Sequence, residues 1–321
     1  MKFGEIKQQA PFTVIVEPTE GCNLGCDFCG LRGMREHGTT PFFFMSLETA
    51  ERIASEVARA GWNSKIVFAN HGEPTVNQNL KEIIAIFRRY LPNALLHMFT
   101  NGFGFKKAKD VEQYVDDLFA AGLNNIIVDS YEENGDWTFV YDLDQDKRKV
   151  VVYEQGVPLF STTKKPRLLL VPPIQLDENE RSTRKLANHC GAAAPLDTSY
   201  NNKRCTMPFR EMVFRHDGNV NLCCDDFRGE YPIANIHEMA IEDIWNHERF
   251  QAARIMLYNR DRRFRPCHGC TNVSMRVGLL PDCQGKETLP EITKEVRDVA
   301  TRVHRRGTLS KIIIKRPWEE K

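Results

Sequence analysis

The sequence of 321 residues lacks any apolar run of the roughly 18–20 residues that a transmembrane helix needs. Its N-terminal segment also lacks the apolar stretch of a secretory signal. Charge of one sign is missing too, because 44 Lys and Arg against 43 Asp and Glu give a net charge of +1. These absences exclude a membrane-spanning protein and predict a cytoplasmic location. They also favour neither nucleic acid nor an anionic membrane as a partner.

Cysteine, by contrast, is abundant, with ten residues in a chain that is otherwise ordinary at 41% hydrophobic and 27% charged. That composition is typical of a folded globular protein. In a reducing cytoplasm, clustered thiols bind metals more often than they form disulfides. We therefore expect the cysteines to identify a metal cofactor.

Strand-like and helix-like segments alternate through the first half of the chain. The predicted strands span residues 12–16, 65–70, 94–101 and 125–130, and the predicted helices span 46–61, 80–90 and 110–121. Strands joined by helical crossovers form parallel sheets, so we predict an α/β fold, as an open sheet or a barrel. Two further apolar runs, at residues 149–154 and 167–174, would complete a partial (β/α)6 TIM-like barrel.

The pattern of the sequence changes after a polar connector at residues 177–203. A hairpin with Asp217-Gly218 at its turn follows, then a predicted helix at 241–257 and a pair of cysteines. We predict a barrel domain over residues 1–195, a small C-terminal domain over 196–285, and a helical, basic tail over 286–321.

Three cysteines, Cys22, Cys26 and Cys29, lie in a C-x3-C-x2-C spacing directly after the first predicted strand. Three thiolates leave one iron of a cubane cluster open to a further ligand, whereas structural zinc normally takes four closed ligands. Active sites of α/β folds gather at the carboxyl ends of strands, which is where this trio falls. A partial zinc site is the alternative.

This cysteine trio, with Phe28 before its third member, resembles the signature of the radical S-adenosylmethionine superfamily. Further motifs follow the next predicted strands in order. They are Gly72, Glu73 and Pro74 in a segment similar to the Gly-Gly-Glu-Pro motif of the family, with His71 in place of the first glycine, then Thr100 and Asn101, and then Ser130. The resemblance implies that these residues bind S-adenosylmethionine, with the Glu73 carboxylate accepting hydrogen bonds from its ammonium group.

The resemblance also implies the chemistry. In this superfamily, a [4Fe–4S] cluster held by three cysteines binds S-adenosylmethionine and reduces it. The product is a 5′-deoxyadenosyl radical, which removes a hydrogen atom from an unactivated carbon. A flavodoxin- or ferredoxin-type reductant is the implied partner.

A second cysteine set lies in the C-terminal part, as C-x12-G-x4-C followed by C-x2-C. It resembles the SPASM and Twitch extensions of the same superfamily. The set comprises Cys205, Cys223, Cys267 and Cys270. Four thiolates close one [4Fe–4S] cluster, so the resemblance implies a Twitch-type domain with one auxiliary cluster and two [4Fe–4S] clusters in the chain. A four-cysteine zinc site is the alternative.

Three further cysteines have no assigned cluster. Cys224 adjoins a predicted ligand and is interpreted as a packed thiol, and Cys283 as a surface thiol or a substitute ligand. Cys190 lies in the segment Asn188-His189-Cys190-Gly191, where related enzymes carry an Asn-Arg-Gly-Gly-like segment facing the cofactor. It is a structural thiol in one interpretation and a hydrogen-atom donor in the other.

Within the superfamily, the motif order over residues 12–280 most resembles dehydrogenases that oxidise a secondary alcohol of an aminocyclitol to a ketone. The resemblance is weak over residues 131–200, so it does not identify the substrate. We expect an oxidoreductase acting on a small sugar or aminocyclitol. Radical epimerisation of such a compound and modification of a peptide are the alternatives, and a zinc-stapled binding module is the alternative outside enzymes.

Overall fold

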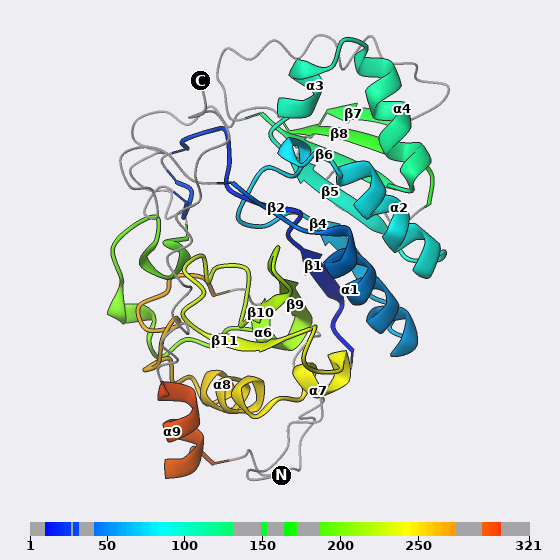
Figure 1. Ribbon diagram of the computed structural model, residues 1–321. Coiled ribbons are helices and arrows are strands. Elements are labelled where there is room, and N and C mark those ends of the chain that lie inside the picture. Colours follow the sequence, from blue (N-terminus) through cyan, green and yellow to red (C-terminus); the bar gives the residue numbers. More distant parts are fainter. Residues whose placement is uncertain are drawn as a thin grey trace, which may run out of the picture.

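The computed structural model describes residues 10–26, 28–31, 42–130, 149–152, 164–171, 187–273 and 291–302. Its centre is a nine-stranded sheet that runs through the whole molecule (Figure 1). The strands follow the order β11-β10-β9-β1-β4-β5-β6-β8-β7. Strands β1 to β8 of this sheet are parallel, and β9 pairs with β1 in parallel before the antiparallel β10 and β11 close the other edge.

The strands of the large sheet are β1 (Thr13–Val16), β4 (Lys65–Phe68), β5 (Leu96–Thr100), β6 (Asn125–Asp129), β7 (Lys149–Val152), β8 (Arg167–Val171), β9 (Glu211–Phe214), β10 (Asn219–Asn221) and β11 (Pro232–Asn235). A separate ribbon pairs β2 (Thr19–Glu20) with β3 (Phe43–Phe44). The helices are α1 (Leu47–Arg59), α2 (Leu80–Tyr90), α3 (Phe103–Lys107), α4 (Val111–Ala121), α6 (Met207–Arg210), α7 (Ile241–Trp245), α8 (Glu248–Tyr258) and α9 (Lys294–Thr301). None of the helices in the described part of the chain is long and apolar enough to cross a membrane.

Helices α1, α2 and α4 lie along one face of the parallel strands (Figure 1). Local chemistry fixes where two of them begin. The Ser46 side chain accepts a hydrogen bond from the Thr49 amide at the start of α1, and Asp110 caps α4 by accepting from the Gln113 amide. Their buried apolar faces cover Val14, Ile66 and the other inward residues of the sheet. This arrangement confirms the predicted α/β fold with a parallel sheet.

The order of the last two parallel strands differs from the sequential order of a simple barrel. Strand β8 lies between β6 and β7, so the strand that comes later in the chain occupies the inner position. The predicted hairpin is present as β9 and β10, with Gly218 in the left-handed conformation at φ +81°. Since β9 pairs with β1, the C-terminal hairpin extends the same sheet. The domain division at residues 195 and 196 stays a prediction.

The predicted single helix over 241–257 is wrong, because the segment forms two helices, α7 and α8. They separate at Asn246-His247, where the His247 ring accepts a hydrogen bond from the Arg249 amide and so begins a new helix. Helix α8 is buried on all sides and lies beneath the β9–β11 end of the sheet. From the predicted tail, α9 packs against α8 and buries Val296, Val299 and Ala300.

Candidate functional site

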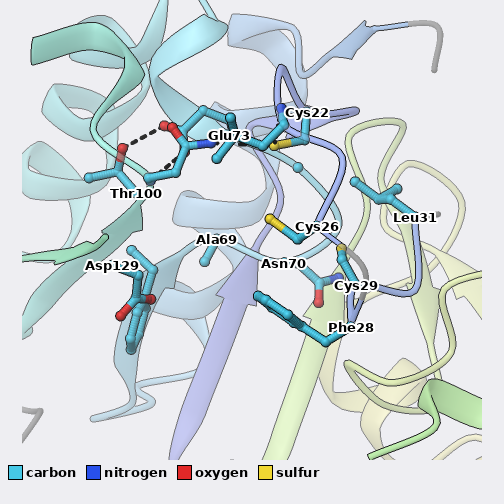
Figure 2. A pocket seen from close by; sticks show the side chains of 14 residues that line it. Cys22, Cys26, Phe28, Cys29, Leu31, Ala69, Asn70, Glu73, Thr100 and Asp129 are labelled. Atoms are coloured by element: carbon cyan, nitrogen blue, oxygen red, sulfur yellow. Dashed lines mark hydrogen bonds between the residues drawn. The ribbon is translucent and has the colours of Figure 1, made fainter. Parts of the chain in front are cut away.

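The carboxyl ends of β1, β4, β5 and β6 meet at one edge of the sheet, and a pocket opens there (Figure 2). The loop after β1 supplies the three cysteines, and the loops after the other strands face them across the pocket. The pocket is lined by Cys22, Leu24, Cys26, Phe28, Cys29, Leu31, Ala69, Asn70, Gly72, Glu73, Phe99, Thr100, Asn101 and Asp129. The cysteine trio and the strand-end motifs, which are far apart in the sequence, therefore form one site.

A backbone contact between two glycines holds the cysteine loop in place. Gly21 and Gly72 form an isolated parallel bridge, in which the Gly21 amide donates to the His71 carbonyl and the Glu73 amide donates to the Gly21 carbonyl, both at 3.0 Å. A Cβ atom on Gly72 would lie 2.1 Å from the Thr19 carbonyl oxygen. This close approach of two backbones explains why the position requires glycine.

Glu73 connects the loops after β4 and β5. Its Oε1 accepts hydrogen bonds from the Thr75 amide (2.9 Å), the Thr75 hydroxyl (2.5 Å) and the Thr100 hydroxyl (2.6 Å), and its Oε2 accepts from the Asn101 amide (2.7 Å). The side chain is buried, and burial raises the pKa of its carboxyl group. With one bond at Oε2, that oxygen retains capacity to accept another donor from the pocket.

Asn101 links this network to the cluster loop, because its side-chain amide donates to Cys22 Sγ at 3.4 Å and to Asn23 Oδ1 at 3.0 Å. Burial raises the pKa of the Cys22 thiol to about 11. A soft metal such as iron displaces the proton of such a thiol on binding. Three thiols of this kind beside a buried carboxylate fit the donor set that an iron–sulfur cluster with one open iron requires.

Of the predicted S-adenosylmethionine contacts, Gly72, Glu73, Thr100 and Asn101 line the pocket. Pro74 and Ser130 are not among its lining residues in the described part of the chain, and their roles stay predictions. Pro74 begins a 3-10 turn, and the Ser130 amide donates to the Val171 carbonyl. Asp129, which sequence reasoning missed, reaches the pocket from the end of β6. The sequence offered one signal for Asp129, its position at the end of a predicted strand.

The second cysteine set also gathers in space. Burial and the neighbouring thiols of Cys223, Cys270 and Cys205 raise the pKa of Cys267, which places the four predicted ligands together. A fully buried Arg262 joins the segments that carry them, since its guanidinium donates to the carbonyls of Arg204 and Cys270 at 2.8 Å. Arg262 had no sequence signal, because its partners are backbone atoms.

The spacing of the sulfur atoms bears on which metal fits. Among the described residues, the three ligand atoms that all lie within 4.8 Å of one another belong to Glu17, Glu20 and His216, so no three cysteine sulfurs are that close. Zinc with Zn–S bonds of about 2.3 Å holds its sulfurs roughly 3.8 Å apart. Within the described residues, no three of the cysteine sulfurs therefore have the spacing of a bound zinc ion.

Cys190 belongs with this second set. Its thiol lies beside those of Cys223 and Cys270, and it does not line the pocket described above. The predicted hydrogen-donor role of Cys190 therefore gains nothing from the structure and stays a prediction. The Cys224 thiol is buried beside the carboxylate of Glu211, as expected of a packed thiol. Cys283 lies outside the described residues.

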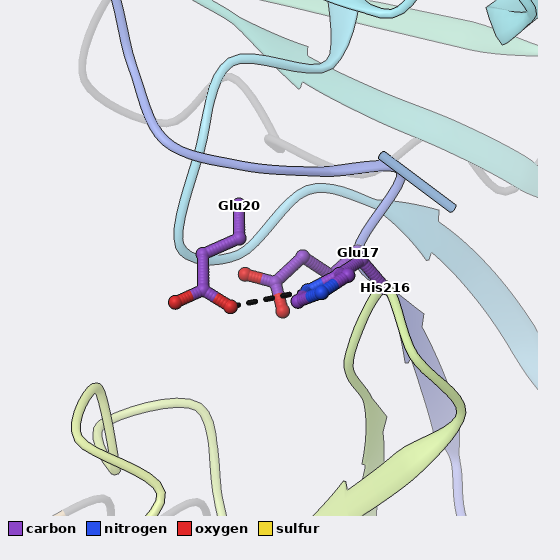
Figure 3. Close-up of side chains that lie close together, drawn as sticks. All are labelled: Glu17, Glu20 and His216. Carbon is purple, nitrogen blue, oxygen red and sulfur yellow. Dashed lines mark ion pairs between the residues drawn. The ribbon is translucent and has the colours of Figure 1, made fainter. Parts of the chain in front are cut away.

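Glu17, Glu20, Arg215 and His216 form a charged cluster. Figure 3 shows its two carboxylates and the His216 ring. Arg215 lies 2.5 Å from Glu20 and 3.4 Å from Glu17, so its guanidinium already balances both carboxylates. Hydrogen bonds from Arg215 and His216 outweigh the effect of burial and lower the pKa of Glu20 to about 2. The three ligand atoms noted above thus belong to an ion-pair cluster with its own cation.

His71, at the position where the family motif has glycine, connects this cluster to the second cysteine set. It is fully buried, its Nε2 lies 2.8 Å from the Cys224 carbonyl oxygen, and its ring packs on Phe227 with centroids 4.2 Å apart. Phe227 in turn packs against Gly30 and Leu31 of the cysteine loop. His71 and Phe227 therefore link the cysteine loop to the segment that carries Cys223 and Cys224.

Comparison with known families identifies both regions. Residues 16–131 match the model of the radical SAM superfamily, and residues 205–271 match the SPASM model, an iron–sulfur cluster-binding domain. The chain belongs to the radical SAM superfamily. A radical SAM domain together with a SPASM domain implies S-adenosylmethionine and two iron–sulfur clusters, in agreement with the two cysteine sites described above. Cys22, Cys26 and Cys29 are suited to hold the first cluster.

Individual radical SAM proteins extend the match over most of the chain. The S-adenosyl-L-methionine-dependent 2-deoxy-scyllo-inosamine dehydrogenase of Niallia circulans is 25% identical over 269 residues, which cover 82% of this chain and 93% of that protein. The GTP 3′,8-cyclase of Pectobacterium atrosepticum is 34% identical over 116 residues, or 36% of this chain and 33% of the cyclase. The crystal structure of BtrN in complex with AdoMet and 2-DOIA has a TM-score of 0.62 and 23% identity, covering 84% and 96% of the two chains.

Replacing Glu73 should weaken S-adenosylmethionine binding. A charge-assisted hydrogen bond contributes roughly 1.5–3 kcal/mol, so we expect Glu73→Ala to raise the Kd of S-adenosylmethionine by about ten- to a hundredfold. Binding to the iron-loaded protein is measured by equilibrium dialysis. Thr100→Val keeps the carboxylate while removing one of its donors and should have a smaller effect.

The exposed Glu82 of α2 provides the matched control, because Glu82→Ala removes a carboxylate away from the pocket. Iron content must be equal in all variants, since the prediction concerns the cofactor and not cluster assembly. An unchanged Kd in a fully loaded Glu73→Ala protein would contradict the role.

Proposed function

We propose that this radical SAM enzyme oxidises a secondary alcohol of a sugar or aminocyclitol to a ketone, with loss of two electrons and two protons. The observation that carries the proposal is a second gathered set of cysteines in a chain that is similar to an aminocyclitol dehydrogenase over 82% of its length. When bound, the first cluster and S-adenosylmethionine supply a 5′-deoxyadenosyl radical, and the second cluster supplies a one-electron acceptor.

The residues of the chain then have distinct tasks. Glu73 and Asn101 would hold the amino acid part of S-adenosylmethionine, while the walls formed by Phe28, Leu31 and Phe99 exclude water from the reactive carbon. Loss of the carbinol hydrogen leaves a carbon radical that bears a hydroxyl group. Once a base removes the hydroxyl proton, that radical becomes a strong reductant and releases its electron to give the ketone.

His189 is the base that we propose. Its Nδ1 lies 2.8 Å from the buried Asp225 carboxylate, which also accepts from the Asn272 amide group. Asp225 orients the ring and leaves Nε2 to accept a proton, as in His–carboxylate pairs of other enzymes. The His189 ring packs on Phe227, the residue that contacts the cysteine loop, and a quarter of the side chain is exposed.

Replacing His189 should separate radical formation from ketone formation. General-base catalysis contributes typically 10²- to 10⁴-fold, so we expect His189→Gln to lower ketone formation by about that factor. Formation of 5′-deoxyadenosine should continue, because the radical step does not need this base. His237→Gln is the matched control, since that ring is hydrogen-bonded to Thr49 on α1. Equal losses of 5′-deoxyadenosine and ketone in His189→Gln would refute the base.

Product analysis tests the proposed reaction itself. Iron-loaded protein is incubated anaerobically with dithionite, S-adenosylmethionine and 2-deoxy-scyllo-inosamine, with related aminocyclitols and sugars as a panel. Oxidation gives a product two mass units lighter, with one 5′-deoxyadenosine per ketone. Epimerisation, the second candidate, gives an isomer of the same mass in H₂O, and the isomer gains one deuterium when the reaction is run in D₂O. This result would overturn the proposal.

The reductant and the cellular location are also part of the proposal. The reaction needs an electron for each turnover, and a flavodoxin or ferredoxin is the reductant that we propose. A reducing cytoplasm would keep the cysteines available for iron, and none of the nine cysteines in the described part of the chain forms a disulfide.

A further inference from the structure

Five cysteines, rather than four, meet at the auxiliary site, and four are enough to hold a [4Fe–4S] cluster. The fifth is Cys190, whose thiol contacts the thiols of two predicted ligands, Cys223 and Cys270. Cys190 thus lies beside two of the four predicted ligands and is itself buried.

The backbone holds Cys190 in a conformation that favours glycine. Its φ and ψ are 54° and 34°, and its neighbours His189 and Gly191 have φ of 45° and 83°. A side chain in this left-handed region is strained, so the conformation persists only where its surroundings determine it. Glycine would relieve the strain at this position, which suggests that the thiol itself has a use.

Two clamps fix the loop on either side of Cys190. The Asn188 side chain donates to the Gly269 carbonyl at 2.8 Å and accepts from the Thr271 amide at 3.0 Å, on the segment that carries Cys270. His189 binds Asp225 at 2.8 Å, two residues after Cys223. The loop is therefore anchored to both ligand segments, and the Cys190 thiol is presented between them.

We propose that Cys190 is a positioning residue that donates an S–H hydrogen bond to the sulfur of Cys223 or Cys270 and thereby raises the reduction potential of the auxiliary cluster. A donor pointed at a ligand sulfur stabilises the extra negative charge of the reduced cluster. A higher potential makes the cluster a better acceptor for the electron of the substrate radical. The inference rests on the auxiliary cluster that the proposed alcohol oxidation uses.

The test measures the midpoint potential of the auxiliary cluster by EPR-monitored redox titration of the full chain. The background carries Cys22→Ala, Cys26→Ala and Cys29→Ala, so that the auxiliary cluster gives the signal. Into it are introduced Cys190→Ala, Cys190→Gly and Cys190→Ser. We expect Ala and Gly to shift the potential to more negative values, while Ser, which keeps an O–H donor, stays closer to Cys.

Cys190→Gly separates the hydrogen bond from folding, because it relieves the backbone strain and should raise the thermal unfolding temperature while still lowering the potential. Unchanged potentials in both the Ala and Gly variants would overturn the proposal. Loss of about four irons in those variants would overturn it too, since Cys190 would then be a ligand. If the triple cysteine variant used as background contained no iron, the auxiliary cluster itself would be refuted. The proposed function is tested separately, by an alcohol-oxidation assay on wild-type protein loaded with about eight irons per chain.

Discussion

Changing Cys22, Cys26 and Cys29 together to alanine should abolish cleavage of S-adenosylmethionine while leaving about four irons per chain. The three thiols lie on one loop at the carboxyl ends of the parallel strands, where they line the same pocket as Glu73 and Asn101. The auxiliary set lies on other segments of the chain and should keep its [4Fe–4S] cluster. Iron and sulfide analysis together with chromatography of 5′-deoxyadenosine measures both effects.

The magnitude expected is complete loss of 5′-deoxyadenosine above the background of the reductant alone. Cys224→Ala is the matched control for removing a cysteine thiol, because Cys224 packs on Glu211. That variant should keep about eight irons per chain. Cleavage that survives in the triple variant would show that another set of residues holds the catalytic cluster.

Removing two auxiliary ligands should have the opposite pattern of effects. We expect Cys223→Ala with Cys267→Ala to lower the iron content from about eight to about four per chain and to stop ketone formation. Cleavage of S-adenosylmethionine should persist, because the first cluster and Glu73 are untouched. The substrate radical would then lack its electron acceptor, so 5′-deoxyadenosine should form without an equivalent of ketone.

Both ligands are buried, so the double variant also loses packing, and its folding must be checked by circular dichroism. Metal analysis gives a second test of whether the four auxiliary cysteines bind an iron–sulfur cluster or zinc. A zinc site would give one zinc and about four irons in the wild-type protein. Ketone formation that is undiminished in a folded double variant would contradict the electron-acceptor role.

The catalytic half of the site was predictable because its residues follow strands. The strand that ends at Val16 precedes Cys22, and the strand that ends at Phe68 precedes Glu73. Parallel strands bring their carboxyl ends to one edge, so order along the chain was enough to place these residues together. Helix α1 was equally predictable, because Ser46 marks its start and the spacing of its apolar residues marks its buried face.

Other features depend on information that local patterns do not carry. Successive residues of a strand point to opposite faces, and the choice between Asp129 and Ser130 as the pocket residue depends on that phase. Strand β8 enters between β6 and β7 because of tertiary pairing, and no periodicity encodes that order.

The position of Cys190 was hidden for a different reason. Its partners are 33 and 80 residues away, at Cys223 and Cys270, and the contact is set by a left-handed loop. Sequence alone showed a cysteine near a family motif, and this left two interpretations, a structural thiol and a hydrogen-atom donor. The clamp formed by Asn188 and the 269–271 segment places it at the auxiliary site instead.

The fate of the hydrogen atom on the carbinol carbon gives the most direct test. A substrate carrying deuterium at that carbon is incubated with the iron-loaded wild-type protein, and the label is followed by mass spectrometry in both products. We predict one deuterium in each 5′-deoxyadenosine and an equal amount of unlabelled ketone. Unlabelled 5′-deoxyadenosine, or deuterium retained in a product of unchanged oxidation state, would contradict a radical dehydrogenase.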